Sequence, residues 1–533
     1  MAVSLAEPVG AAAPAPAAND LDAVRRRLLP PMPTDRVGSW VASFVVFLVA
    51  LWLRVHRLDI PSKQAFDELY YRHDSYNIWK HGIELDADKF EGGFIVHPPV
   101  GKWMLGLGQV LFGDGLDPTY VKELSSRKEA FSWRIMAAVV GALTVLMLCR
   151  LGRRLFRSTL LGCTAGLLMA VDGLHFTMSR IALLDIFLLF WLVAAAACLL
   201  VDRDDLRRRV AARLAEHGAD GWNGRWTGIR PWRMAAGVCL GLAVGTKWSG
   251  VYFLVAAMLI SLAWEIGARR VAGVRRPGKV ALRSVAPILL TLGVVPVAAY
   301  VASYAGWFIT DIGYRRTCFP AGVDTGTYWA RWGYGHLADC GPVKGFIRYQ
   351  QDILEFHKQL NTAKDPHSYQ SHPIGWLVLY RPVAYWYVSP STGTSQAIVG
   401  LGTPAIWWAS IPALLVVLWR WATTRDWRAG FIVAGFAANY IPWFWSDIVD
   451  HRTMFFFYAL PMLPFICLGL AYCCGLASGG RRAGPDRRMW GALAAGGYLL
   501  LVIANFVWLY PVLSAQVIDY QDWYARMWLK TWI

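Results

Sequence analysis

Residues 131–150 read FSWRIMAAVVGALTVLMLCR, and no charged side chain lies between Arg134 and Arg150. A helix of about 20 apolar residues is long enough to cross a hydrocarbon layer roughly 30 Å thick. Comparable stretches recur along the chain from Val41 to Tyr510. Of the 533 residues, 56% are hydrophobic and 17% are charged, whereas an average soluble domain has about 45–50% and about 25%. The sequence therefore predicts an integral membrane protein and excludes a single soluble globule.

The chain is expected to be an all-α polytopic membrane protein with about eleven transmembrane helices. The spans are predicted at residues 38–57, 131–150, 159–178, 182–201, 233–247, 249–266, 283–304, 397–419, 429–446, 453–474 and 489–510. Two connections are long, at residues 58–130 and 305–396, and both are rich in Trp, Tyr, Phe and His. Loops of this length are usually functional or disordered, and their aromatic content favours order.

The basic residues predict the orientation in the membrane. The segments 1–37, 150–158, 202–233, 267–283, 420–428 and 478–488 together hold 29 Lys+Arg against 11 Asp+Glu, whereas residues 54–134 hold 11 against 12. Because cytoplasmic loops carry an excess of Lys and Arg, the N-terminus is predicted in the cytoplasm, and an odd number of spans places the C-terminus outside the cell membrane. The net charge of +17 is therefore an orientation signal and does not indicate nucleic acid as a partner.

Residues 1–37 are rich in Ala and Pro, and no apolar core precedes Val41. We therefore expect a disordered cytoplasmic tail rather than a cleaved signal peptide, followed by one transmembrane domain over residues 38–533.

Seven of the nine cysteines fall in or beside apolar spans, where a small packed side chain is the simplest interpretation. Cys318 and Cys340 share the second external loop, so we expect them to form a disulfide.

An acidic pair, Asp67 and Glu68, follows the first span closely. Such a pair in a loop is usually a solvated surface feature. Here it lies near the membrane surface, before an amphipathic stretch from Leu69 to Trp79 that suits an interfacial helix. A half-buried carboxylate in this setting can act as a general base towards a hydroxyl, provided that a cation keeps it ionised.

Further along the loop stands HPPVGK, residues 97–102. One interpretation is a rigid turn before a short helix starting near Val100. The alternative is that His97 and Lys102 face the same external cavity as Asp67.

Cations recur near the predicted external ends of spans, namely Arg134, Arg180 and Lys247. Most such residues extend to the interface without a further role, and Asp185 could form a local salt bridge with Arg180. Ionisable residues at membrane depth are nevertheless candidates for function. Together these three cations suit an anionic headgroup, with a phosphate as the obvious candidate.

The second long loop contains Phe346, Tyr349, Ile353, Phe356 and Leu360 at helical spacing, which predicts an amphipathic helix on the membrane. It ends in HSYQSHPIGW, residues 367–376, and RPVAYWY, residues 381–387. His367 and Arg381 in these segments are candidates for substrate binding. The chain has no phosphate-binding loop, dinucleotide fingerprint or metal-spaced acidic run. We therefore expect a lipid-linked donor and no required cofactor, although a divalent metal stays an alternative.

The sequence resembles the protein O-mannosyltransferase family, and most closely its actinobacterial members. The matching stretches lie in family order: FDE at 66–68, HPPVGK at 97–102, WRIMAAVVGALTV at 133–145, SRIALLDIF at 179–187, GLAVGTKWSG at 241–250, HSYQSHPIGW at 367–376 and RPVAYWY at 381–387. The resemblance implies a GT-C glycosyltransferase fold with an extracytoplasmic active site. It also implies that Asp67 is the catalytic base, with Glu68 beside it, and that Arg134 binds the donor phosphate.

The activity implied by the resemblance is transfer of mannose from polyprenyl-phosphate mannose to Ser/Thr hydroxyls of exported proteins, with inversion at the anomeric carbon. The bilayer and the secretion translocon are then expected partners. Eukaryotic members carry a large β-trefoil insertion in the second external loop, and about 90 residues between Tyr304 and Ala397 cannot hold it. Acceptor recognition is therefore left without an obvious module. Two alternatives stay open: a polyprenyl-phosphate-dependent pentosyl or aminopentosyl transferase, and a flippase for the lipid-linked sugar.

Overall fold

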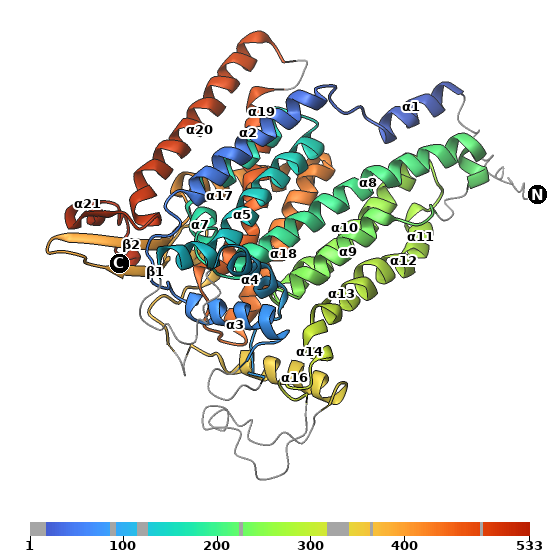
Figure 1. The fold of residues 1–533 in the computed structure, drawn as a ribbon. Helices are drawn as coiled ribbons and strands as arrows, with labels where there is room; N and C mark the ends of the chain where they lie inside the picture. The colour runs from blue at the N-terminus through green and yellow to red at the C-terminus, as the bar shows by residue number, and fades with distance from the viewer. Residues whose placement is uncertain are drawn as a thin grey trace, which may run out of the picture.

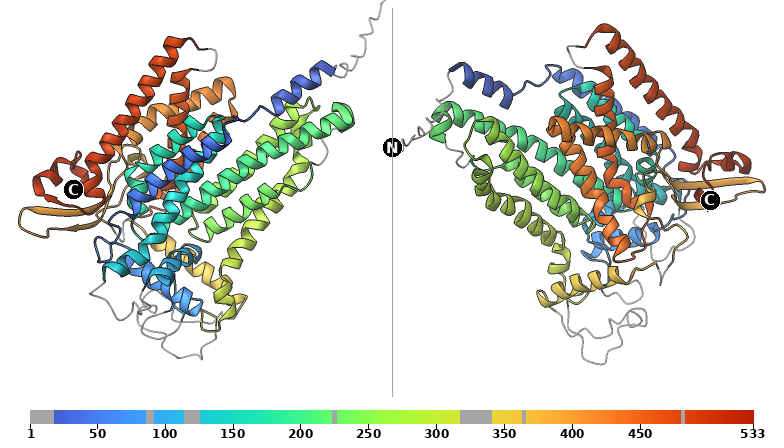
Figure 2. Two further views of the ribbon diagram at one scale, coloured as in Figure 1. Left: turned by 45° about the horizontal axis from the view of Figure 1, so that its top comes forward. Right: turned by 180° about the vertical axis from the view of Figure 1, so that it is seen from behind.

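The computed structural model describes residues 18–85, 92–113, 126–222, 227–316, 341–362, 366–479 and 483–533, and most of them are helical. Figures 1 and 2 show long helices running side by side in a bundle. The first ten helices are α1 (Ala18–Leu28), α2 (Arg36–Val55), α3 (Glu68–His81), α4 (Val100–Phe112), α5 (Arg127–Phe156), α6 (Thr159–Ala170), α7 (Gly173–Met178), α8 (Asp185–Trp222), α9 (Pro231–Val244) and α10 (Gly250–Val271). The later ones are α11 (Pro277–Ala281), α12 (Val285–Leu289), α13 (Val295–Ser303), α14 (Ala305–Ile309), α16 (Lys344–Gln359), α17 (Pro404–Thr424), α18 (Trp427–Ile448), α19 (Leu463–Ser478), α20 (Pro485–Leu513) and α21 (Tyr520–Ala525).

Eight helical segments of the described chain are long and apolar enough to cross a membrane. They are Arg36–Val55, Arg127–Phe156, Asp185–Gly218, Gly250–Val271, Pro277–Ser303, Pro404–Thr424, Phe456–Ser478 and Pro485–Leu513. The remaining three predicted spans fall on α6 and α9, which are apolar but shorter, and on α18. Every predicted span thus coincides with a helix at least in part, while the count of eleven crossings stays a prediction.

The chain is mostly helical, as predicted, and it also contains a small antiparallel sheet that the sequence did not predict. Its strands are β1 (Val383–Val388), β2 (Thr394–Gly400) and β3 (Val517–Asp519), in the order β1-β2-β3. The span predicted at 397–419 therefore begins as a strand, and its helix starts only at Pro404. The aromatic and β-branched residues of β1 favour an extended chain, whereas Pro404 suits the first turn of α17.

Part of the segment that was predicted as a disordered tail is helical in the structure. Residues 18–28 form α1, and Leu28 is buried in a small apolar cluster with side chains of α8 and α10. The contacts of Leu28 with two other helices explain why α1 is held in place, which the Ala- and Pro-rich composition of this segment did not indicate.

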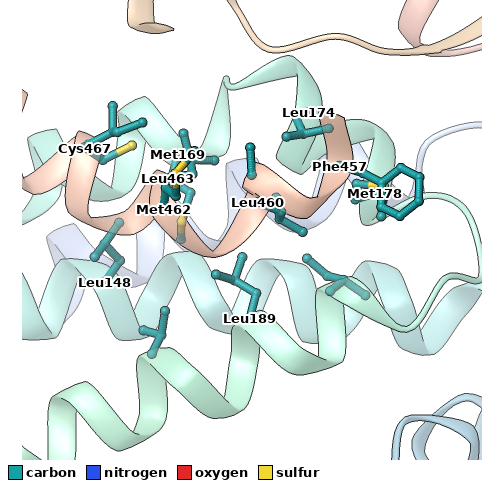
Figure 3. Packing of buried hydrophobic residues seen from close by; sticks show 14 of the residues in the cluster. Leu148, Met169, Leu174, Met178, Leu189, Phe457, Leu460, Met462, Leu463 and Cys467 are labelled. Atoms are coloured by element: carbon teal, nitrogen blue, oxygen red, sulfur yellow. The ribbon is translucent and has the colours of Figure 1, made fainter. Parts of the chain in front are cut away.

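The main core lies where the central helices meet. Figure 3 shows Leu148 of α5, Met169 of α6 and Leu189 of α8 packed around Leu460 and Leu463 of the segment that leads into α19. All five of these side chains are 0% exposed. Residues more than 250 positions apart are thus fixed against each other, so the segments at the ends of these helices have a rigid support.

The two long loops contain helices, and those labelled α3, α14 and α16 lie at the same end of the bundle. The predicted helices at Leu69–Trp79, from Val100 and around Phe346–Leu360 are confirmed as α3, α4 and α16. Figure 1 shows α3, α14 and α16 at the lower end, away from α1 and from the junction of α19 and α20. Gly82 ends α3 with a positive φ of 82°, a conformation that glycine adopts without strain.

Candidate active site

Asp67 stands immediately before α3, at the position that caps its first turn. The main-chain oxygen of Asp67 accepts hydrogen bonds from the amides of Tyr70 and Tyr71, while its carboxylate does not cap the helix. Burial raises the pKa of Asp67 to about 6, nearby Lys247 opposes this rise, and Asp185 adds to it. Asp67 is therefore a carboxylate that is largely ionised at neutral pH and basic enough to accept a proton.

Glu68 is fully buried and is held from three sides. Arg134 donates to it through Nε and Nη2, at 2.8 Å and 2.6 Å from Oε1 and Oε2. The main-chain amides of Ala65 and Ala182 donate at 2.8 Å each. Four donors fix this carboxylate, so Glu68 anchors the start of α3 to α5 and to the segment before α8.

Arg134 also fixes the segment that leads to the acidic pair. Its Nη1 donates to the main-chain oxygens of Leu58 and Pro61, at 3.3 Å and 2.6 Å, and its Nη2 donates to that of Lys63 at 3.0 Å. With the two bonds to Glu68, all five N–H groups of this guanidinium are engaged. The family resemblance implied that Arg134 binds the donor phosphate, but direct contact with a phosphate would require it to break some of these bonds.

Lys247 and Asp185 form a buried ion pair, with Nζ at 3.0 Å and 2.9 Å from the two carboxylate oxygens. The salt bridge expected between Arg180 and Asp185 is therefore wrong. Arg180 instead donates to main-chain oxygens at the end of α2 and just beyond it, those of Leu53, Arg54, His56 and Arg57. These carbonyl groups are left unpaired where a helix ends, which explains why a buried arginine lies there.

A cavity of about 370 Å³ lies next to this ion pair. Its polar lining includes His97, Asp185, Lys247, His357, Lys358, Asp450 and Arg452, and its aromatic lining includes Trp248, Tyr252, Trp443 and Tyr458. Burial and neighbouring cations lower the pKa of His97 well below its usual value and that of His357 to about 3. Both imidazoles are therefore neutral. The lining then holds three cations (Lys247, Lys358 and Arg452) against two carboxylates (Asp185 and Asp450), and this net positive charge suits an anion.

The cations of the cavity come from distant parts of the chain. Arg452 Nη2 donates to His357 Nδ1 at 3.1 Å, which joins the segment after α18 to α16. Lys247 lies 5.6 Å and 5.5 Å from the ring centres of Phe457 and Tyr458. The sequence did not single out His357 or Arg452. The amphipathic helix Lys344–Gln359 was the available signal for His357, because one face of such a helix must lie against the protein.

Lys102 does not line this cavity, contrary to the alternative in which His97 and Lys102 face the same cavity as Asp67. It is fully buried, with Nζ at 2.5 Å from Glu84 Oε1 and 3.7 Å from Asp74 Oδ2. Burial raises the pKa of Asp74 to about 7, although Lys102 opposes the rise. Lys102 therefore joins α4 to α3 and the chain that follows α3.

His367 and Arg381 also lie outside the cavity lining. His367 Nδ1 accepts from the amide of Tyr369 at 3.1 Å, and its ring lies 5.0 Å from that of Phe455. Arg381 donates to the main-chain oxygens of Ser368, Thr531 and Ile533. Arg381 thus ties the chain before β1 to residues after α21.

Two predictions about ligands and cross-links stay open. Cys318 and Cys340 lie outside the described residues. The described chain on either side comes together, because the Gly341 amide donates to the Arg315 oxygen at 3.0 Å. Among the residues that the structure describes, no group of three or more His, Cys, Asp and Glu side chains could hold a metal ion.

Comparison with known proteins identifies the family. The family model described as dolichyl-phosphate-mannose-protein mannosyltransferase matches residues 44–309, and that of the C-terminal four-transmembrane region of protein O-mannosyltransferase matches residues 342–532. The polyprenol-phosphate-mannose–protein mannosyltransferase of Mycobacterium tuberculosis is 36% identical over 94% of this chain and 93% of its own. The protein of the same name from Corynebacterium glutamicum is 31% identical over 93% of both chains.

A solved structure supports the fold. The Saccharomyces cerevisiae protein O-mannosyltransferase Pmt1–Pmt2 complex, bound to its sugar donor, contains a chain that matches with a TM-score of 0.70 at 15% identity, over 97% of this chain and 95% of that one. The predicted GT-C fold is confirmed by this match. With the family models and with curated relatives above 30% identity over nearly the whole length, the chain belongs to the protein O-mannosyltransferase family of glycosyltransferases.

Proposed function

We propose that this protein transfers mannose from polyprenyl-phosphate mannose to Ser/Thr hydroxyls of exported proteins. The observation that carries the proposal is Asp67, a carboxylate with its pKa raised to about 6, whose charge is influenced by Lys247 and Asp185, and both of these residues line a cavity that holds further cations. The names of the mycobacterial and corynebacterial relatives support the same donor and a protein acceptor. The bilayer supplies the donor, and the secretion translocon is the expected source of unfolded acceptor.

In the proposed reaction the donor phosphate occupies the cavity, next to Lys247 and Arg452. Asp67 takes the proton of the acceptor hydroxyl as its oxygen bonds to the anomeric carbon of mannose. The bond from that carbon to the phosphate oxygen breaks, and its electron pair leaves with the phosphate, where the two cations offset the growing charge. One displacement of this kind inverts the anomeric carbon and needs one base.

The bonds of Glu68 and Arg134 support a positioning role for both residues. Glu68 accepts four hydrogen bonds, so it has little capacity left for an acceptor hydroxyl. Arg134 is fully engaged as well. We therefore assign the phosphate to Lys247 and Arg452, with His97 and His357 as neutral partners for the phosphate or sugar.

The reaction is proposed on the extracytoplasmic side of the plasma membrane, with the N-terminus in the cytoplasm and the C-terminus outside. The excess of Lys and Arg in the short loops supports this orientation. Cysteine labelling of intact cells should reach position 344, in α16, and should not reach position 208, in α8. Labelling in the opposite pattern would reverse the proposed orientation.

Neither a pentosyl transferase nor a flippase is favoured by the relatives, which are named as mannosyltransferases. The direct test is to incubate the purified full-length protein in lipid nanodiscs with labelled polyprenyl-phosphate mannose and a Thr-containing peptide. Labelled α- or β-mannosyl peptide also reports the stereochemistry of transfer. Labelled peptide with the pentose donor but not with the mannose donor would contradict the proposal.

A further inference from the structure

We propose that a second cavity, at the end of the bundle opposite α3 and α16, binds an anionic phospholipid whose phosphate is held by Arg428 and Arg487. The cavity has a volume of about 480 Å³ and lies where the ends of α5, α6, α18, α19 and α20 meet. Figure 1 shows the junction of α19 and α20 at this end. In the orientation proposed above, the cavity lies at the cytoplasmic leaflet.

An arginine cluster lies beside this cavity, around one aspartate of α8. Arg154 and Arg203 lie 2.9 Å and 3.3 Å from the carboxylate oxygens of Asp204, and Arg157 lies at 3.9 Å. Arg207 also interacts electrostatically with Asp204 and with Arg157. Four arginines thus surround a single carboxylate.

The arginine cluster continues to the cavity through Arg157. This residue directly follows Phe156, which lines the cavity, and its charge interacts with that of Arg428. Arg428 is paired with Asp426, with Nε at 3.0 Å from Oδ1 and Nη2 at 2.7 Å from Oδ2. Five arginines therefore face two aspartates, which leaves an excess of three positive charges next to the cavity.

These charges are more than an orientation signal, because several of them are withdrawn from water. Basic residues at the membrane surface usually extend into solvent. Arg203 is instead 3% exposed, with its guanidinium 3.3 Å from the ring centre of Trp427, and the side chains of Arg154 and Arg157 are 34% and 22% exposed. Partly buried charges in excess of their partners cost free energy. An anion in the adjoining cavity would offset that cost.

The two arginines of the lining can donate to a phosphate. Nε and Nη2 of Arg428 are held by Asp426, whereas Nη1 has no acceptor within the described residues. The Tyr472 hydroxyl donates to the same aspartate at 2.9 Å and thereby helps to fix it. Arg487 makes one long bond, from Nη2 to the Leu476 oxygen at 3.4 Å. Arginine suits this ligand, because its planar group of donors matches phosphate oxygens.

The rest of the cavity favours a lipid over a soluble anion. Phe156, Leu161 and Leu476 give it an apolar side. Exposed apolar residues flank it, since Leu160 is 74% and Trp490 is 66% exposed, and tryptophan is common at the level of lipid headgroups. Basic pockets between transmembrane helices bind anionic headgroups at the cytoplasmic side. An acyl chain would therefore lie along Leu161 and Leu476, with the phosphate against the arginines.

The first test measures lipid binding to the purified full-length protein by native mass spectrometry. The protein in detergent is titrated with phosphatidylglycerol, which carries one negative charge, and with phosphatidylcholine, which carries no net charge. We expect phosphatidylglycerol to bind with a Kd roughly tenfold lower. In Arg487→Gln, an exposed substitution, this Kd should rise roughly fivefold, the usual contribution of one arginine to binding an anionic lipid. Equal Kd values for the two lipids, or an unchanged value in Arg487→Gln, overturns the proposal.

The matched control is Arg275→Gln. It removes the same charge at an exposed position between α10 and α11, outside the cavity lining, and the proposed orientation places it on the same side of the membrane. The Kd for phosphatidylglycerol should stay at the wild-type value. An equal rise in both variants would mean that general positive charge attracts the lipid, and would overturn the proposal.

A second test separates a lipid from a soluble anion. The melting temperature is measured with phosphatidylglycerol, with its headgroup glycerophosphoglycerol and with inorganic phosphate at equal concentrations. A ligand that binds only the folded protein raises its melting temperature, so the lipid should raise it by several degrees, and by less in Arg487→Gln. Equal stabilisation by the headgroup or by phosphate would overturn the lipid as occupant. Neither test measures mannose transfer, so failure of the proposed function would leave both results intact.

Discussion

Arg134 and Glu68 form a two-pronged ion pair, with Nε to Oε1 at 2.8 Å and Nη2 to Oε2 at 2.6 Å, and both side chains are buried. The pair connects α5 to the first residue of α3, and Asp67 is the residue immediately before it. Because the remaining donors of Arg134 hold the chain at Leu58, Pro61 and Lys63, the direction of the segment that carries the proposed base depends on this one guanidinium.

Arg134→Lys should reduce the stability and the rate without a comparable effect on donor binding. A lysine keeps the charge but has three donors and no planar fork, so at least two of the five bonds are lost. Hydrogen bonds to charged groups contribute about 1.5–3 kcal/mol each. We expect a lower melting temperature and a lower kcat, with the donor KM within about twofold of wild type. A raised donor KM with unchanged stability would instead support direct contact between Arg134 and the phosphate, as the family resemblance implied.

Asp67→Asn should remove most of the activity while the protein still folds. The amide keeps the size of the side chain but cannot accept a proton at neutral pH. General-base contributions are typically about a hundred- to ten-thousandfold, which corresponds to roughly 3–5 kcal/mol of barrier. The measurement is single-turnover transfer from labelled donor, with donor binding as the control for folding. Near-wild-type transfer would exclude Asp67 as the base.

The rate should fall as the pH is lowered through about 6. Burial raises the pKa of Asp67 to about 6, and the base must be deprotonated to act, so kcat/KM should be half-maximal near that pH and fall tenfold per unit below it. His97 and His357 have lowered pKa values and should not titrate in this range. In Asp74→Asn the fall in kcat/KM below pH 6 should persist. The pKa of Asp74 is raised to about 7, but this carboxylate lies near Lys102 and not in the cavity lining. A pH-independent rate between pH 5 and 8 would contradict this assignment.

Arg452→Gln should weaken donor binding. The proposed contact with the phosphate is charge-assisted, and its loss costs about 1.5–3 kcal/mol, or roughly ten- to 150-fold in the donor KM. Lys344→Gln changes the same charge at an exposed position of α16 outside the cavity lining and should have no effect. Equal donor KM values for the two variants would remove Arg452 from the phosphate site.

Cys318 and Cys340 should be disulfide-bonded in protein purified without reductant. The loop between them has about 20 residues, so the cross-link should stabilise this segment by roughly 3 kcal/mol in the chain-entropy model. Mass spectrometry after alkylation under denaturing conditions measures the bond. Alkylation of both thiols without prior reduction would show that the prediction is wrong.

Sequence patterns were enough to predict the membrane-spanning character, the position of most helices and the acidic pair. Apolar length and helical periodicity are properties of neighbouring residues, so they can be read without a fold. The position of Asp67 just after the first span and at the start of an amphipathic helix was readable for the same reason. The resemblance to a family added the role of Asp67, which no local pattern supplies.

The tertiary structure alone decided which cation meets which carboxylate. Arg134 pairs with Glu68 across 66 positions and Lys247 with Asp185 across 62, whereas the sequence favoured the nearby pair of Arg180 and Asp185. Ion pairs in a packed interior depend on which helices lie side by side, and spacing along the chain carries no information about this. His357 and Arg452, which are 95 positions apart, both line the cavity for the same reason: the packing of their segments brings them together. The small sheet was missed because β2 is paired with β1 and β3, and the apolar residues of β2 read like the start of a span until those partners are known.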